Sequence, residues 1–209
     1  MGNQNSPKKT PYFSKEEEEH YTELLEKERF GCQDRRPWKP TNLKELSGLL
    51  GRGNSEVKKV VDLDTGQIMA VKLLKCAPGG IDSYSSIEQE DKILAELNHK
   101  NIVKFYGAFV DQEYLKIYME FVDGGSIYSL LKSTGPLSNE VVSNFTRQIC
   151  EGLEYLHSHK IIHRDIKCAN VLVDRHGNVK LTDFGSAKEL CSVAESYFGT
   201  SGWIAPEVN

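Results

Sequence analysis

The chain lacks most of the features that mark a secreted, membrane-spanning or nucleic-acid-binding protein. No apolar run in its 209 residues is long enough to cross a bilayer, and the start has no secretory hydrophobic segment. The five cysteines are scattered without paired spacing, which argues against a disulfide framework or a zinc site. A net charge of -4 gives no sign of nucleic-acid binding. These absences favour a cytoplasmic protein with reduced thiols and no nucleic-acid partner.

The composition instead suits a folded protein preceded by a polar tail. Hydrophobic residues make up 39% of the chain and charged residues 27%, which allows a sizeable buried core. Residues 1–40 are polar, and the glutamate-rich stretch Lys15–Phe30 predicts a short charged helix. The proline-containing segment Arg35–Pro40 interrupts any helix, so we place the start of the folded part near residue 41.

Two short motifs carry most of the chemical information. HRDIKCAN spans His163–Asn170 and DFG spans Asp183–Gly185, which places two Asp, a Lys and an Asn within about twenty residues. Phosphoryl transfer depends on positioning and on neutralising the charge of the phosphate oxygens, and magnesium prefers oxygen ligands. These side chains at this spacing predict a phosphoryl-transfer site that uses a nucleoside triphosphate and Mg²⁺.

Each of the four side chains has a role in that chemistry. Asp183 supplies the main carboxylate for the metal, and Asn170 supplies a neutral amide oxygen for a second ion. Asp165 accepts or orients the proton of the attacking hydroxyl, and Lys167 meets the γ-phosphate. We therefore predict that Asp165 and Lys167 are catalytic and that Asn170 and Asp183 bind metal.

These motifs resemble those of eukaryotic protein kinases, and the resemblance runs from about Leu46 to Asn209. It implies an α+β fold with two lobes and ATP and Mg²⁺ as cofactors. The expected divisions are a strand-rich N-lobe over 41–119, a hinge over 120–126, and a partial helical C-lobe with the catalytic and activation loops over 127–209. The later strands of the N-lobe are expected at Lys104–Val110 and Leu115–Glu120.

The resemblance assigns the upstream half of the chain to nucleotide binding. Lys72, in the strand-like run MAVK, is expected to contact the α- and β-phosphates as part of the catalytic set. Its expected counter-charge is Glu90 on a predicted helix over residues 86–97, with Glu88 and Asp91 as neighbouring alternatives. The resemblance implies that Val57 and Ala70 form an apolar roof over the adenine and that the main chains of Glu120 and Val122 bind it. The residues predicted to surround the nucleotide are Leu50, Gly51, Gly53, Val57, Ala70, Lys72, Met119, Glu120, Val122, Asn170, Leu172 and Asp183.

The glycine-rich loop departs from the family pattern. Leu50–Val57 reads LGRGNSEV, in which Gly51 and Gly53 match but the third glycine is missing and the loop is one residue short. Glycines allow the backbone to approach the triphosphate closely. We therefore expect the tip of this loop to cover the γ-phosphate differently.

Smaller details indicate the substrate. Lys167 and the segment Gly199–Glu207 resemble the serine/threonine-specific pattern, with Thr200 expected near Asp165. The runs MEFVDGGSI, TRQICEGLEYLHSHKIIHRDIKCANVL and GNVKLTDFGSAK together look most like the MAP kinase kinase kinase group. This resemblance implies that the substrates are other kinases, phosphorylated on Ser or Thr.

Two further patterns predict modification. The expected activation loop, Ser186–Tyr197, contains candidate phosphosites, and Arg164 could pair with a phosphate there. The start MGNQNSPKK matches the N-myristoylation pattern, which makes Gly2 a candidate acceptor and weak membrane contact a candidate property. The candidate phosphosites are Ser192, Ser196 and Tyr197.

The last residues leave two functions open. The chain ends at Asn209, whereas kinases of this family continue through further helices, so we expect an incomplete C-lobe. His163 and Phe184 are expected to stack with Leu94 without the usual anchor of that stack. The first hypothesis is an ATP-dependent serine/threonine kinase. The alternative is a non-catalytic nucleotide-binding or interfering fragment of one.

Overall fold

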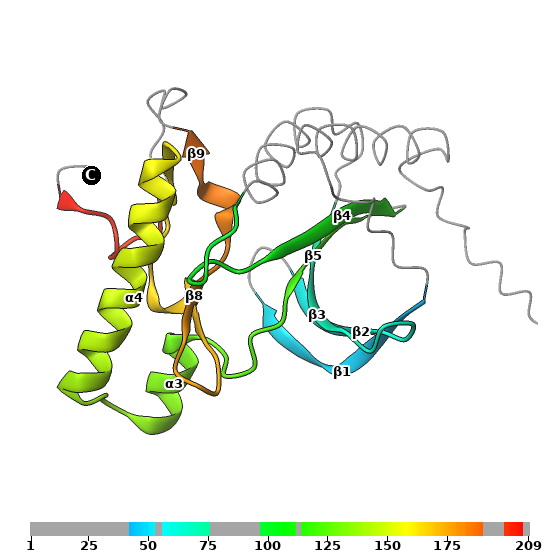
Figure 1. Ribbon diagram of the computed structural model, residues 1–209, viewed down its shortest axis with the longest axis horizontal. Helices are drawn as coiled ribbons and strands as arrows, with labels where there is room; N and C mark the ends of the chain where they lie inside the picture. Colours follow the sequence, from blue (N-terminus) through cyan, green and yellow to red (C-terminus); the bar gives the residue numbers. More distant parts are fainter. Residues whose placement is uncertain (1–41, 53–55, 76–96, 112–113, 190–198, 207–209) are drawn as a thin grey trace, which may run out of the picture.

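The computed structural model describes residues 42–52, 56–75, 97–111, 114–189 and 199–206 (Figure 1). It confirms the predicted α+β architecture with two lobes, since a sheet of strands lies beside a part built from helices and short strands. Some predictions lie outside the described residues. These are the predictions for Gly2, the tail helix, Gly53, Glu90 and its helix, Leu94 and the three phosphosites.

The N-lobe is a five-stranded sheet in the order β1-β2-β3-β5-β4, in which each strand is antiparallel to its neighbour. The strands predicted at Met69–Lys72 and Leu115–Glu120 are confirmed as parts of β3 and β5, and the one predicted at Lys104–Val110 is confirmed as part of β4 except for its first residue. The five strands are β1 (Leu43–Arg52), β2 (Glu56–Asp62), β3 (Ile68–Lys75), β4 (Phe105–Asp111) and β5 (Tyr114–Glu120).

The two faces of this sheet bury different side chains. Because side chains alternate along a strand and paired residues share a face, the register assigns each position to one side. One face carries a separate apolar cluster of Val60, Met69, Val71 and Tyr118. On the other face the pairs Val57–Lys72, Lys59–Ala70 and Ala70–Met119 lie side by side. This second face is the one that turns toward the C-lobe, because Ile117, opposite Lys72, belongs to the core shared by both lobes.

The C-lobe begins with two capped helices. α3 (Ile127–Thr134) starts at Ser126, whose side chain accepts a bond from the backbone N–H of Ser129. α4 (Asn139–Ser158) starts at Ser138, which caps the helix in the same way. The elements that follow are β6 (Ile161–Ile162), η1 (Cys168–Asn170), β7 (Val171–Val173), β8 (Val179–Leu181), η2 (Phe184–Ser186) and β9 (Lys188–Glu189). None of the helices in the described part of the chain is long and apolar enough to cross a membrane.

The pairing of the short strands brings the two sequence motifs together. β7 pairs with β8 and β6 pairs with β9, both antiparallel. The catalytic-loop motif therefore lies between β6 and β7, and the DFG motif follows β8 directly. One apolar core runs through both lobes and includes Phe105 and Ile117 from the sheet and Leu156 and Leu181 from the C-lobe. The pairing of short strands holds the two motifs side by side on this core.

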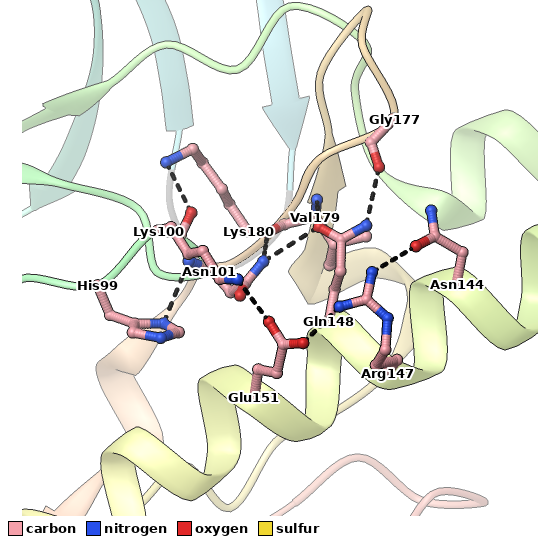
Figure 2. A network of polar contacts seen from close by, with 10 residues as sticks. All are labelled: His99, Lys100, Asn101, Asn144, Arg147, Gln148, Glu151, Gly177, Val179 and Lys180. Carbon is pink, nitrogen blue, oxygen red and sulfur yellow. Dashed lines mark hydrogen bonds and ion pairs between the residues drawn. The ribbon is translucent and has the colours of Figure 1, made fainter.

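A buried polar junction fastens β8 to α4 and to the segment that precedes β4 (Figure 2). The side-chain amide of Asn101 donates to Gln148 Oε1 at 3.1 Å and to the Val179 carbonyl at 2.9 Å. Gln148 accepts the Val179 N–H at 2.9 Å and donates to the Gly177 carbonyl at 3.0 Å. Asn101 and Gln148 are both buried, so these bonds replace water for the groups involved. The junction fixes the strand that leads into the DFG motif.

Candidate active site

The side chains of the catalytic-loop motif converge on the carboxylate of Asp165. Oδ2 accepts a bond from Lys167 Nζ at 2.7 Å and from Asn170 Nδ2 at 2.9 Å. Oδ1 accepts the hydroxyl of Thr200 at 2.7 Å, and Lys167 Nζ also donates to the Thr200 oxygen at 2.6 Å. The expected proximity of Thr200 to Asp165 is confirmed. Three residues of the catalytic loop and one residue from beyond the activation loop thus form a single hydrogen-bonded cluster.

This cluster keeps Asp165 ionised. Burial on its own would raise the pKa of the carboxyl, but the hydrogen bonds from Lys167, Thr200 and Asn170 and the charge of Lys167 outweigh it and lower the pKa below its usual value. The side chain is only 12% exposed. A partly desolvated carboxylate that stays charged at neutral pH is suited to accept a hydrogen bond from a substrate hydroxyl.

The local backbone holds the loop in shape. Arg164 adopts a left-handed conformation with φ of 63°, and its guanidinium donates to the carbonyl of Ser186. The Asn170 amide nitrogen also donates to the main-chain carbonyl of Asp165 at 2.9 Å. A positive φ is uncommon for a residue with a side chain. The bond of Arg164 to the segment after the DFG motif and the bond of Asn170 within the loop compensate for that strained turn and hold Asp165 in place.

Lys72 and Asp183 form the direct contact between the N-lobe sheet and the DFG motif. Lys72 Nζ lies 2.9 Å from Asp183 Oδ1, and the lysine side chain is 8% exposed while that of the aspartate is 47% exposed. Asp183 has a φ of 67°, a left-handed conformation that Asp tolerates better than most residues. The ammonium of Lys72 is therefore buried and directed at the DFG motif, whereas the second carboxylate oxygen of Asp183 belongs to a half-exposed side chain.

The rings of His163 and Phe184 pack together between the catalytic loop and the DFG motif. Their rings lie 4.8 Å apart between centroids, and both side chains are buried. Nε2 of His163 donates to the Thr182 carbonyl at 3.0 Å, which leaves Nδ1 to accept the N–H of Asp165 at 3.4 Å. Burial lowers the pKa of His163, with partial compensation from the Thr182 bond, so the ring is neutral at neutral pH. The predicted contact between these two rings is confirmed.

The predicted nucleotide-contacting residues line two sides of the same region. Val57, Ala70 and Lys72 lie on the sheet face that turns to the C-lobe, and Met119 is opposite Ala70. The main-chain N–H of Glu120 is committed to the Lys104 carbonyl at 2.8 Å, so an adenine contact by Glu120 has to use its carbonyl. The remaining predicted residues are Leu50 in β1, which is 46% exposed, Gly51 in β1 opposite Val57, Val122, which is buried just after β5, and Leu172, which is half-buried in β7.

The donors near Asp183 and Asn170 fit a metal ion that also binds phosphate. Within the described residues, no group of three or more His, Cys, Asp or Glu side chains is placed to hold a metal by itself. Magnesium commonly takes one or two protein oxygens and completes its shell with phosphate oxygens and water. The amide nitrogen of Asn170 is directed at Asp165, which turns its oxygen the other way. A carboxylate and an amide oxygen are the donor types that Mg²⁺ prefers.

Comparison with known proteins decides the family. The family model described as "Protein kinase domain" matches residues 45–209. The chain belongs to the protein kinase domain family. The residues matched by that model include both motifs and every residue of the Asp165 cluster.

The kinase domain is similar in sequence to mitogen-activated protein kinase kinase kinases from several organisms. It is 44% identical over 172 residues to mitogen-activated protein kinase kinase kinase ANP1 of Arabidopsis thaliana, covering 77% of this chain and 26% of the relative. It is 41% identical over 177 residues to mitogen-activated protein kinase kinase kinase A of Dictyostelium discoideum, covering 80% and 19%. It is 42% identical over 172 residues to the human mitogen-activated protein kinase kinase kinase 3, covering 77% and 28%. The kinase domain therefore spans less than a third of these relatives' length.

Two side chains of the kinase domain were not anticipated at the site. The carboxylate of Glu120, considered only for its backbone, pairs with Lys180 Nζ at 3.0 Å and accepts the N–H of Lys104 at 3.2 Å. Lys59 lies with its Nζ 4.1 Å from the centroid of the Phe121 ring. Lys59 could have been found from the sequence, because it is two residues after Val57 and strand alternation puts both on one face. No local pattern pointed to the pair of Glu120 and Lys180.

Proposed function

We propose that the kinase domain transfers the γ-phosphoryl group of ATP to Ser and Thr hydroxyls of protein substrates. The observation that carries this proposal is the cluster in which Lys167, Thr200 and Asn170 all donate to Asp165. It supports the serine/threonine class in particular, because Thr200 and Lys167 are the positions that resemble that pattern. The names of the similar proteins support the same reading.

Each of the charged and polar side chains near Asp165 and Asp183 has a separate role in the proposed reaction. Lys72, buried and cationic, binds the α- and β-phosphates. Asp183 and Asn170 hold Mg²⁺, which when bound neutralises charge on the phosphate oxygens. Lys167 lies next to Asp165 and supplies positive charge for the transferred group. Most of the catalytic effect in this class of reaction comes from such positioning and electrostatic stabilisation.

Asp165 orients and deprotonates the attacking hydroxyl. In the structure one of its oxygens already accepts a hydroxyl, that of Thr200, at 2.7 Å. A substrate Ser or Thr presents the same chemical group and can be held by the same carboxylate. The oxygen–phosphorus bond to the substrate forms as the bond to ADP breaks, and the hydroxyl proton passes to Asp165.

The proposed substrates are downstream kinases. The relatives' names state that they are kinases of mitogen-activated protein kinase kinases. We extend this to the present chain and propose Ser or Thr residues in the activation segments of such kinases as acceptors. An in vitro reaction with a catalytically inactive MAP kinase kinase, followed by mass spectrometry of the phosphopeptides, identifies the acceptor residues.

A phosphotransfer assay with a matched variant tests the reaction itself. We expect incorporation of phosphate from ATP–Mg²⁺ into the substrate by the wild-type chain and almost none by Asp165→Asn. Glu154→Gln, an exposed carboxylate on α4, serves as the control and should behave like wild type. Nucleotide binding without any Asp165-dependent transfer would overturn the proposal and favour a non-catalytic nucleotide-binding role.

A further inference from the structure

Lys59 lies on the face of β2 that turns toward the C-lobe. The register pairs it with Ala70, and Ala70 is paired with Met119 on the next strand. All three share the sheet face that turns toward the C-lobe, one cross-strand row away from Val57 and Lys72. Lys59 therefore lies beside the predicted roof of the adenine pocket. Its neighbour Lys58 points to the opposite face, where it pairs with Glu45 at 3.1 Å.

The side chain of Lys59 is held by the hinge. Its ammonium lies 4.1 Å from the centroid of the Phe121 ring, well within the range of a cation–π contact, and both side chains are half-buried. Phe121 stands between Glu120 and Val122, the two residues whose main chains are predicted to bind adenine. The contact thus joins β2 to the segment that follows β5, next to the residues expected to bind adenine.

We propose that Lys59 and Phe121 form a clasp at the mouth of the nucleotide pocket and that this clasp positions the nucleotide. The contact holds β2, which carries Val57, close to Phe121 at the end of β5. The spacing between β2 and the main chain of Glu120 and Val122 therefore stays near the value that suits a bound purine. Without the clasp, β2 can move away from the hinge, and the binding-competent form is less populated. The apparent dissociation constant rises by the same factor as that population falls. Lys59 is on this view a positioning residue, and it determines nucleotide affinity rather than the chemical step.

The inference rests on the proposed function, because it assigns a role in nucleotide binding to residues outside the catalytic cluster. Lys59→Met keeps the length of the side chain and removes its charge, and Phe121→Leu removes the ring. Each variant should weaken binding of ATP roughly 3- to 10-fold, the range expected for one partly desolvated cation–π contact. Lys59→Arg, which keeps the cation over the ring, should restore most of the affinity. Lys58→Met, on the opposite face of the same strand, is the matched control and should bind as wild type does.

The experiment measures the dissociation constant of ATP–Mg²⁺ by calorimetry, together with KM and kcat, for these variants and for the double variant Lys59→Met/Phe121→Leu. If the clasp positions the nucleotide, KM for ATP should rise in the single variants while kcat stays unchanged. The double variant should bind ATP no more weakly than the weaker-binding single variant, because the two residues act through one contact. Thermal melting of each variant checks that it is folded.

Two outcomes overturn the inference, and they differ from failure of the proposed function. Affinity of Lys59→Met equal to that of wild type, or fully additive effects in the double variant, would show that the contact does not set nucleotide binding. A fall in kcat with KM unchanged would place Lys59 in the chemistry and would also contradict it. Absence of any nucleotide binding or transfer by the wild-type chain would instead overturn the proposed function, and the clasp with it.

Discussion

The hydroxyl of Thr200 donates to the carboxylate of Asp165 at 2.7 Å, although 35 positions separate the two residues. The same hydroxyl oxygen accepts a bond from Lys167. The segment after the activation loop is thereby connected to the residue that we propose to receive the substrate proton. A change in the conformation of that segment therefore alters the hydrogen bonds of Asp165 and Lys167 through the Thr200 hydroxyl.

Thr200→Ala should lower kcat by about 10- to 100-fold, because a hydrogen bond to a charged group is worth about 1.5–3 kcal/mol and its loss lets Asp165 and Lys167 rearrange. KM for ATP should change little, since the contacts of Lys72 and Asp183 are untouched. Thr200→Ser keeps the hydroxyl and should retain most of the activity. Steady-state kinetics on the three proteins checks this, and an alanine variant with wild-type kcat would contradict it.

Lys72→Met should reduce phosphoryl transfer by at least about 100-fold, the usual scale for loss of one preorganised electrostatic contact at the reacting group. The fold should survive, because the partner left behind, Asp183, is 47% exposed and can be solvated. Lys75→Met, at the exposed end of the same strand, is the control. Initial rates and circular dichroism are the measurements. A variant that transfers phosphate normally would refute the role given to Lys72.

Gln148→Leu should destabilise the chain by about 2–4 kcal/mol, because the Val179 N–H and the Gly177 carbonyl lose their side-chain partner and the buried amide of Asn101 loses one of its two acceptors. Arg147→Gln, one residue earlier on the same helix, removes an ion pair with Glu151 and a hydrogen bond to Asn144, both made by an exposed guanidinium, and should cost less than about 1 kcal/mol. Urea unfolding of both variants gives the comparison. Equal effects would mean that the junction in Figure 2 does not contribute more than a surface pair.

Acidification should destabilise the fold through His163. Its pKa is lowered in the folded chain, first by burial, so between that pKa and the unfolded value of about 6.5 the unfolded state binds more protons. The stabilising contribution is therefore complete above about pH 6.5 and is lost as the pH falls through that value toward the folded pKa. Burial lowers the pKa of His99 as well, which acts in the same direction.

The free energy of unfolding should accordingly fall between pH 7.5 and pH 5.5. His163→Phe keeps a ring against Phe184 but removes the titrating group, so its free energy of unfolding should depend less steeply on pH. Urea titrations at both pH values measure the two slopes. Identical slopes for wild type and His163→Phe would exclude this source of pH dependence. His157→Gln, which replaces an exposed histidine of α4, is the control for the loss of a histidine as such.

The sequence allowed the family, the two lobes and the strands β3 to β5 to be predicted because each depends on neighbouring residues. The motifs HRDIKCAN and DFG are continuous runs whose residue types are dictated by phosphate and metal chemistry. Strands with a buried face leave a local pattern of apolar residues. The contact of His163 with Phe184 also followed from the resemblance, since both belong to motifs.

Other contacts of the structure have no local pattern in the sequence from which they could be predicted. The bonds of Asn101 to Gln148 and of Glu120 to Lys180 join residues that have no common periodicity, and each looks in the sequence like an ordinary polar residue. The roles predicted for Glu90 and Gly53 lie outside the described residues and stay predictions.

What the sequence determined by itself is the kind of reaction, because phosphoryl transfer needs particular acids, amides and ammonium groups, and these appear in order along the chain. Only the tertiary structure decided which of them meet. Lys72 reaches Asp183 across 111 positions, Thr200 reaches Asp165 across 35, and Lys59 of β2 lies over the ring of Phe121. Such contacts are set by strand register, by the path of the hinge and by the packing of two lobes on one core. Those depend on the whole chain at once and are not visible in any one segment of it.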